Sequence, residues 1–257
     1  MTLHFDPAPA AARLAQAKRT HHHFDALPAH ERPTSLAQGY AVQDAFRAAL
    51  GEEVGGYKVA AANAAALRTS EFGLALFGYM GRTHMHGNAA VVQRVEGAPF
   101  TLEVEVGFEL ACDADPAREP LDCQRMLASS FLAFEIVCSR YVDRKVVGAP
   151  SFVADDSAFH AFVRGDALPG VDASALWTTP ASLIHEGASI TPALSGDACT
   201  DPMRSLALFW EHAATYQLSL KRGQVITTGT LVQAIDVQAP GKYEGRLGDA
   251  RVVFTLV

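Results

Sequence analysis

Apolar and polar residues alternate along much of the chain after residue 90, a pattern typical of β-strands with one buried face. In the run TLEVEVGFEL, Val104, Val106 and Phe108 point one way, whereas Glu103 and Glu105 point the other. This run is the clearest predicted strand. Other runs rich in Val, Ile, Thr and Phe predict further strands over residues 91–95, 131–141, 224–232 and 250–257.

The first third of the chain shows a helical period instead. Residues 10–19 are rich in alanine, and residues 36–50 place their large apolar side chains along one helical stripe. Ser35 is a suitable N-cap for this second helix, and Gly51 is suited to end it. A later helix is predicted over residues 207–222, and Gly223 follows it.

These elements predict an α+β protein whose strands are mostly antiparallel. We expect a helical N-terminal portion over residues 1–85 and a β-rich catalytic core over residues 86–257. Residues 81–93 read as a connection because they contain glycine and asparagine. Pro-Gly at 240–241 and Gly-Asp at 248–249 predict turns between short strands near the C-terminus.

Three glutamates carry the candidate chemistry. Glu103 and Glu105 share one face of a strand, so their carboxylates repel each other unless one takes a proton or a cation lies between them. Glu135 interrupts the run FLAFEIVC, which is apolar on both faces. A charge there is costly unless it is paired or bound to a metal. Three oxygen ligands from two strands would suit a hard divalent cation such as Mg²⁺.

Each glutamate also has a simpler interpretation. A Glu-x-Glu pair on an amphipathic strand is often part of a solvated face. For Glu135, the alternative to a metal is a buried salt bridge to arginine or lysine. His84 and His86, spaced two apart, form a minor alternative metal site, and the histidine run 21–23 reads as a solvated helix end.

Lys58 lies in the predicted strand GGYKVAAA, among small and apolar residues. A partly desolvated lysine can bind a substrate carboxylate, and burial can lower its pKa far enough for proton transfer. The alternative is an edge-strand lysine that discourages aggregation.

Composition narrows the classes of function. The chain has 257 residues and a net charge of −7, with no basic block that could neutralise phosphates, so a nucleic-acid partner is not expected. Four scattered cysteines with no Cys-x-x-Cys fit a reducing compartment. We find no signal-peptide core and no stretch long enough to span a membrane, and we expect a cytoplasmic protein.

Short motifs occur in an order that resembles the fumarylacetoacetate hydrolase superfamily, from about Leu36 to the C-terminus. The resemblance is strongest to the branch of 2-oxopent-4-enoate hydratases and 4-oxalocrotonate decarboxylases. The motifs are Tyr-Ala-Val-Gln-Asp (40–44), Gly-Tyr-Lys (56–58), Phe-Gly-Leu (72–74), Met80, Glu-Val-Glu (103–105), Glu-Ile-Val-x-Ser-Arg-x-x-Asp-x-Lys (135–145), Val-Ala-Asp-Asp (153–156), Thr-Gly-Thr (228–230), Pro-Gly (240–241) and Leu-Gly-Asp-Ala-Arg-Val-Val-Phe (247–254).

The resemblance implies a fold and a site. The fold would be a mixed β-roll core with a helical N-terminal portion, assembled into homo-oligomers. The site would hold Mg²⁺ or Mn²⁺ through Glu103, Glu105 and Glu135. Other matching residues are Lys58 and Asp155, which would be catalytic, and Thr228, Gly229 and Thr230, which would contact the substrate.

The function implied is that of a metal-dependent lyase in the catabolism of aromatic compounds. As a hydratase it would add water to a 2-hydroxy-2,4-dienoate or 2-oxo-4-enoate through a metal-chelated enolate. Alternatives are a 4-oxalocrotonate-type decarboxylase, a hydrolase that cleaves a C–C bond in an acylpyruvate-like substrate, and a non-catalytic partner subunit. A complex with a related decarboxylase or hydratase is a further expectation.

The chain departs from the motifs of the hydratase relatives at a few positions, which leaves its substrate and reaction open. Residues 59–63 replace the usual Ile-Gly-Leu-Thr-Ser, and Tyr79 stands where an acidic residue precedes the methionine. Asp156 replaces the asparagine of Val-Ala-Asp-Asn, and Lys242 replaces the aspartate after the late Pro-Gly.

Overall fold

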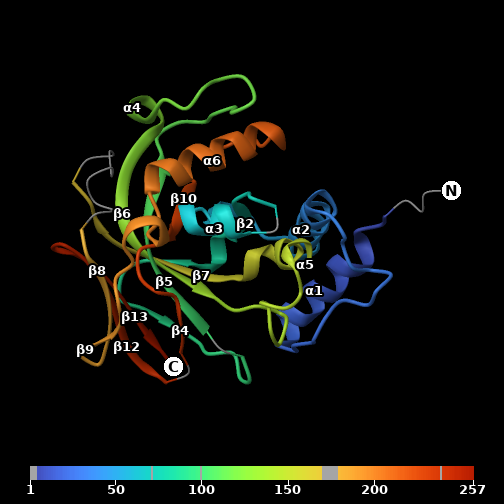
Figure 1. Ribbon diagram of the computed structural model, residues 1–257, viewed down its shortest axis with the longest axis horizontal. Helices are drawn as coiled ribbons and strands as arrows, with labels where there is room; N and C mark the ends of the chain where they lie inside the picture. The colour runs from blue at the N-terminus through green and yellow to red at the C-terminus, as the bar shows by residue number, and fades with distance from the viewer. Residues whose placement is uncertain (1–4, 71, 99, 170–178, 238) are drawn as a thin grey trace.

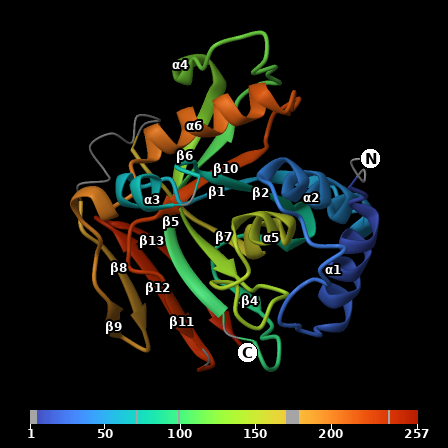
Figure 2. The same cartoon turned by 45° about the vertical axis from the view of Figure 1, so that its right-hand side comes forward.

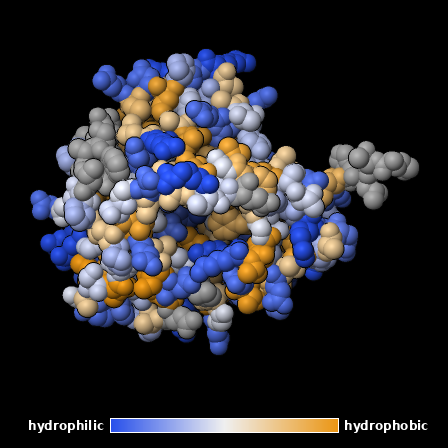
Figure 3. All heavy atoms as spheres, in the orientation of Figure 1, coloured by the Kyte–Doolittle hydropathy of each residue, from blue (hydrophilic) through white to orange (hydrophobic). Residues whose placement is uncertain are grey.

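The computed structural model describes residues 5–70, 72–98, 100–169, 179–237 and 239–257. The strands form two β-sheets, and the helices α1, α2 and α5 gather at the side away from the smaller sheet (Figures 1 and 2). The surface seen in the same orientation is hollowed near its middle, where hydrophilic and hydrophobic side chains meet (Figure 3).

The helices are α1 (Ala8–Thr20), α2 (Leu36–Leu50), α3 (Ala64–Thr69), α4 (Cys123–Met126), α5 (Ala149–Ala154) and α6 (Pro202–Thr215), with short turns η1 (Arg82–His84), η2 (Asp156–Ala158) and η4 (Gly196–Ala198). The strands are β1 (Val54–Ala60), β2 (Leu76–Gly81), β3 (Met85–His86), β4 (Ala90–Val92), β5 (Phe100–Leu110), β6 (Leu127–Val137), β7 (Phe159–Ala167), β8 (Ala181–His185), β9 (Ala188–Thr191), β10 (Val225–Thr230), β11 (Ile235–Val237), β12 (Gly241–Leu247) and β13 (Ala250–Leu256).

The larger sheet has eight strands in the order β2-β1-β10-β5-β6-β7-β3, with β11 paired to β5. The smaller sheet has the order β4-β13-β12-β8-β9. Most pairs are antiparallel, as predicted, and the exceptions are β1 with β10, β3 with β7 and β4 with β13. The long strands β5 and β6 pair along their whole length at the centre of the larger sheet, so side chains from both can meet on either face.

The main core lies between the two sheets. The rings of Phe134 on β6 and Phe254 on β13 meet edge to face, with centroids 5.1 Å apart. Val104 on β5 packs where Gly245 on β12 has no side chain, because a Cβ on that glycine would lie 3.1 Å from Val104. One face of β5 and β6 is therefore covered by the smaller sheet, which leaves the opposite face for Glu103, Glu105 and Glu135.

The N-terminal helix prediction is confirmed in detail. Helix α2 spans Leu36–Leu50, its N-cap Ser35 accepts a hydrogen bond from the Gln38 N–H, and Gly51 closes it in the left-handed conformation. Strands β1 and β2, from the predicted N-terminal portion, belong to the same sheet as β5 from the predicted core. The division of the chain after residue 85 stays a prediction.

The later helix was placed wrongly. Helix α6 begins at Pro202, after an N-cap at Asp201, and ends at Thr215 rather than at residue 222. It ends there because Gln217 takes a left-handed conformation (φ 54°) and the Leu218 N–H bonds back to the Ala213 carbonyl. The chain then runs on to pair Leu220 with Ala114.

Two smaller expectations also need correction. The strand predicted over residues 91–95 is only β4, and the connection predicted over residues 81–93 contains the short strands β3 and β4. No helix in the described ranges is both long enough and apolar enough to cross a membrane.

Candidate metal centre

The three predicted glutamates meet on one face of β5 and β6. Glu103 lies directly opposite Glu135 in the antiparallel register, and Glu105 is one step along the same face. One carboxylate oxygen from each residue lies within 4.8 Å of the other two. Glu105 and Glu135 are fully buried, and Glu103 is half-buried. The strand pattern therefore predicted the convergence of these side chains correctly.

Glu105 is held by an irregular segment of β10. Its Oε2 accepts hydrogen bonds from the backbone N–H groups of Thr228 and Gly229, at 3.1 and 3.0 Å. Two neighbouring N–H groups can converge on one oxygen because the register between β10 and β5 shifts between Thr227 and Thr230. Gly229 has φ 95°, a conformation that residues with a Cβ rarely adopt, which explains the glycine in Thr-Gly-Thr.

Replacing Gly229 with alanine should destabilise the protein by about 1–3 kcal/mol, because the backbone conformation is strained for any residue with a Cβ. The new Cβ would also lie 3.0 Å from Thr200 Oγ1. Urea unfolding measures the effect. Gly248→Ala is the matched control, since Gly248 also has a positive φ (57°) but no atom lies within 4 Å of its Cβ position. Equal losses in both variants would contradict a special role for Gly229.

Lys58 completes the cluster. Its Nζ lies 2.8 Å from Glu135 Oε1 and donates a hydrogen bond to the Ser157 carbonyl at 3.0 Å, and its side chain is only 2% exposed. Gly78 faces Lys58 across the β1–β2 pair, and a Cβ there would lie 3.1 Å from Lys58 Cγ. The buried salt bridge considered for Glu135 therefore exists, and it exists within the cluster of carboxylates.

Burial and neighbouring charges shift the pKa values of Glu105, Glu135 and Lys58. Burial raises the pKa of Glu105 well above its usual range, and the neighbouring carboxylates of Glu135 and Glu103 add to the shift. Burial also raises the pKa of Glu135 to about 7, although Lys58 opposes the change. For Lys58, burial disfavours the charge, but the surrounding carboxylates outweigh it and raise its pKa above the ordinary value. This direction is opposite to the lowered pKa considered from the sequence.

The cluster has the charge and the free oxygens that a divalent cation requires. Three carboxylates face one ammonium, so two negative charges are unbalanced when all are ionised. Glu105 Oε1 and Glu135 Oε2 are buried and accept no hydrogen bond from any described residue. A buried carboxylate oxygen without a partner is costly, whereas a hard cation would satisfy both.

The other predicted site residues have structural partners. Both carboxylate oxygens of Asp155 are engaged: Oδ1 accepts from Arg140 Nε, and Oδ2 accepts from Ser139 Oγ at 2.7 Å. The hydroxyl of Thr228 donates to the Val106 carbonyl at 2.8 Å, and that of Thr230 donates to the Val232 carbonyl at 2.9 Å. Contact of these residues with a substrate stays a prediction.

Sequence reasoning missed the residues that support Lys58, among them Arg140, Ser157 and Gly78. Arg140 lies in the Ser-Arg motif, but only the fold shows that its guanidinium reaches Asp155. The histidines considered as alternatives lie elsewhere. His84 Nε2 bonds to Glu52 Oε1 at 3.1 Å, and no histidine of the described chain joins the glutamate cluster.

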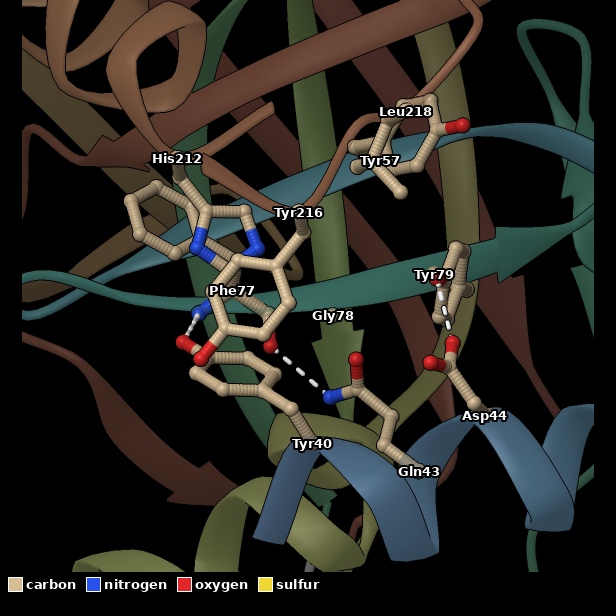
Figure 4. Close-up of a pocket in the computed structure, with 10 residues that line it drawn as sticks. All are labelled: Tyr40, Gln43, Asp44, Tyr57, Phe77, Gly78, Tyr79, His212, Tyr216 and Leu218. Carbon is tan, nitrogen blue, oxygen red and sulfur yellow. Dashed lines mark hydrogen bonds between the residues drawn. The ribbon is translucent and has the colours of Figure 1, made fainter. Parts of the chain in front are cut away.

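An aromatic pocket lies between α2 and α6 (Figure 4). Tyr40 and Asp44 come from α2, His212 comes from α6, and the Tyr79 hydroxyl donates to Asp44 Oδ1 at 2.6 Å. Its cavity volume of about 20 Å³ has room for about one water molecule. Tyr79 pairs with Tyr57, one step from Lys58, and so faces away from the glutamates. This departure from the motifs thus lies outside the metal centre.

Comparisons by sequence found no match: no family model matches the chain, and no curated protein resembles it significantly. Solved structures do resemble it. 4-Oxalocrotonate decarboxylase from Pseudomonas putida G7, complexed with magnesium and adipate, has a TM-score of 0.84 at 18% identity and covers 98% of this chain and 97% of its own. In complex with calcium and acetate, it has a TM-score of 0.81 at 18% identity over the same shares.

A more distant structure is fumarylpyruvate hydrolase from Pseudomonas aeruginosa, in complex with Mn²⁺ and pyruvate. It has a TM-score of 0.54 at 12% identity, over 78% of this chain and 88% of its own. At these identities the likeness shows the fold alone. The fumarylacetoacetate hydrolase-like fold predicted from the sequence is therefore confirmed.

Proposed function

We propose that this chain, which has the fold of the fumarylacetoacetate hydrolase superfamily, is a divalent-metal-dependent lyase acting on a short 2-oxo acid. Glu103, Glu105 and Glu135 would hold Mg²⁺ or Mn²⁺. The observation that carries the proposal is the pair of buried, unpartnered oxygens, Glu105 Oε1 and Glu135 Oε2, in a cluster whose three carboxylates face a single ammonium. The magnesium, calcium and manganese bound by the similar structures support the same assignment.

The chemistry follows from the groups present. When bound, a divalent cation supplies Lewis-acid stabilisation for the negative charge of the substrate's enolate. The Lys58 ammonium would bind a carboxylate oxygen of the substrate, because its raised pKa keeps it charged. The Thr228 and Gly229 N–H groups hold Glu105 in place. Apolar side chains on the same side of the sheet exclude water and strengthen these interactions; they are Met80, Phe131, Ala133, Phe159, Phe162 and Val225.

Two lyase reactions share this enolate. The motifs favour hydration of a 2-hydroxy-2,4-dienoate, in which water adds to the conjugated double bond. Decarboxylation is the second candidate, because the likeness to 4-oxalocrotonate decarboxylase extends over 98% of the chain. Hydrolysis of a C–C bond is less well supported, because it would need a histidine near the metal to activate water, and no histidine of the described chain joins the carboxylates.

Two assays test the proposal. Loss of 2-hydroxypenta-2,4-dienoate absorbance, measured with and without Mg²⁺, reports hydration. Release of CO₂ from 2-oxohex-3-enedioate reports decarboxylation. We expect cation-dependent turnover in one of the two, and absence of both in protein that demonstrably binds Mg²⁺ would refute the lyase assignment.

Cation affinity should rise with pH through about 7. The raised pKa values of Glu135 and Glu105 mean that both carboxyls hold protons at low pH, and a cation must displace them. Each displaced proton weakens binding about tenfold per pH unit below its pKa. Calorimetric titrations with Mn²⁺ between pH 5.5 and 8.5, in buffers of different ionisation enthalpy, measure both the affinity and the protons released. An affinity independent of pH over this range would contradict carboxylate ligands with raised pKa values.

We also propose a cytoplasmic homo-oligomer, as the family resemblance and the scattered cysteines suggest. Light scattering during size-exclusion chromatography measures the number of subunits directly.

A further inference from the structure

We propose that the turn 156–158 positions the Lys58 ammonium beside Glu135, and that the Arg140–Asp155 ion pair fixes the conformation of this turn. Asp155, Ser157 and Arg140 would then act through Lys58 rather than on a substrate. The inference concerns the centre of the proposed function, but its first test does not depend on metal binding or turnover.

The turn supplies the second partner of Lys58. The ammonium lies between Glu135 Oε1, at 2.8 Å, and the Ser157 carbonyl, at 3.0 Å. A lysine side chain has a flexible four-carbon stem, so without this contact the ammonium could reach several of the neighbouring carboxylate oxygens. The carbonyl draws the ammonium to one side of Glu135. As a result Glu135 Oε2 and Glu105 Oε1 stay without partners and remain available to a cation.

The backbone of this turn is strained. Asp156, Ser157 and Ala158 have φ values of 55°, 46° and 62°, so three consecutive residues with a Cβ lie in the left-handed region. This conformation is unfavourable for such residues, because the Cβ comes too close to the following carbonyl oxygen. Such a run persists only where the surroundings enforce it, and strained residues of this kind concentrate at functional sites.

The enforcing contacts are visible. The buried Arg140 guanidinium donates to the Asp155 carboxylate and to the Asp155 carbonyl, and it also donates to the carbonyls of Cys138 and Phe159 at 3.0 Å each. It thus joins the end of β6 to both sides of the turn. Hydrogen bonds from a buried charged group are strong and geometrically specific, so they fix the position of the backbone carbonyls that accept them.

Strand β2 fixes the turn from its other side. The Ser157 hydroxyl donates to the Phe77 carbonyl at 2.9 Å, and the Tyr79 N–H donates to Asp156 Oδ1 at 2.6 Å. Gly78, between these two residues, leaves the space that the turn needs, because a Cβ there would lie 2.7 Å from the Asp156 carbonyl. The turn is therefore held against the same strand that lies beside Lys58.

The direct test observes Lys58 itself in metal-free protein. The chain has five lysines, so labelling lysine with ¹⁵N gives few side-chain signals, and Lys58→Met identifies the signal of Lys58. We expect a slowly exchanging ammonium in the unmodified protein. Asp155→Asn, which weakens the hold of Arg140, and Ser157→Gly, which frees the backbone, should each speed its hydrogen exchange at least about tenfold.

Ala89→Gly is the matched control, because Ala89 is exposed and also left-handed (φ 64°). It should relieve similar strain and leave the Lys58 signal unchanged. An unchanged Lys58 signal in both Asp155→Asn and Ser157→Gly would overturn the inference. If Asp155→Asn fails to fold, Ser157→Gly decides the question alone.

A second measurement separates positioning from general support. Ser157→Gly should weaken Mn²⁺ binding about fivefold when Lys58 is present, because the released ammonium would compete for the carboxylates. In the Lys58→Met background the same substitution should change the affinity less than about twofold. Equal weakening in both backgrounds would overturn a role through Lys58. If neither the unmodified protein nor any variant binds Mn²⁺, the proposed function is wrong. The hydrogen-exchange experiment would still test whether the turn positions Lys58.

Discussion

Glu135→Gln should abolish turnover that depends on a divalent cation while the protein stays folded. Glutamine has nearly the same shape as glutamate, but it lacks the negative charge that a cation and Lys58 both require. We expect a loss of at least about a thousandfold in kcat/KM, since a charge that stabilises the transition state directly is removed. Steady-state kinetics with added Mg²⁺ measure the effect, and circular dichroism checks the fold.

The chain offers a matched control in Glu109→Gln. Glu109 lies on the same face of β5 but pairs with Arg164 at 2.6 Å and is partly exposed, so its loss should change stability by only about 0–1 kcal/mol and leave turnover intact. Glu135→Gln protein that keeps full Mg²⁺-dependent activity would refute the metal centre.

Lys58→Met should separate cation binding from turnover. Methionine fills a similar buried space without charge, so the repulsion between the ammonium and a bound cation disappears. Mn²⁺ affinity should therefore be maintained or increased at pH 8. Turnover should fall by about two to three orders of magnitude, because a substrate carboxylate loses its counter-charge in a buried site.

Calorimetry and steady-state kinetics on the same preparation measure both quantities. Lys221→Met is the control, since Lys221 is exposed and pairs with Asp113 at 3.0 Å on the surface. Loss of cation binding together with activity in Lys58→Met would mean that Lys58 mainly supports the structure. Unchanged turnover would remove it from the mechanism.

Local sequence signals were sufficient where one element decides the structure. The helix over residues 36–50 has its cap, its stripe and its terminal glycine within the segment, and the structure reproduces all three. The helix at 202–215 shows where this approach fails. Its apolar period continues past Thr215, but the backbone of Gln217 and the pairing of Leu220 with Ala114 end the helix earlier. A partner a hundred residues away leaves no signal in the local pattern.

In the candidate site, too, some residues could be identified from the sequence and others only from the structure. Period-two alternation placed Glu103 and Glu105 on one face, and the cost of an isolated charge marked Glu135, so physical chemistry alone selected all three. The support for Lys58 could not be found in this way. Three left-handed residues at 156–158 include no glycine, and Arg140 has no local feature that distinguishes a buried anchor from a surface charge.

By itself, the amino-acid order determined which strands carry acidic side chains, which face of each strand they occupy and where the helix over residues 36–50 begins and ends. Those properties depend on residues that are close together in the sequence, because side-chain alternation in a strand and capping of a helix are set by the local backbone. Only the tertiary structure decided that Glu103 faces Glu135, that Lys58 joins them and that Thr228 and Gly229 bind Glu105. These contacts join residues up to 124 positions apart in the sequence. Strand register and burial between packed layers, rather than local propensity, bring such segments together.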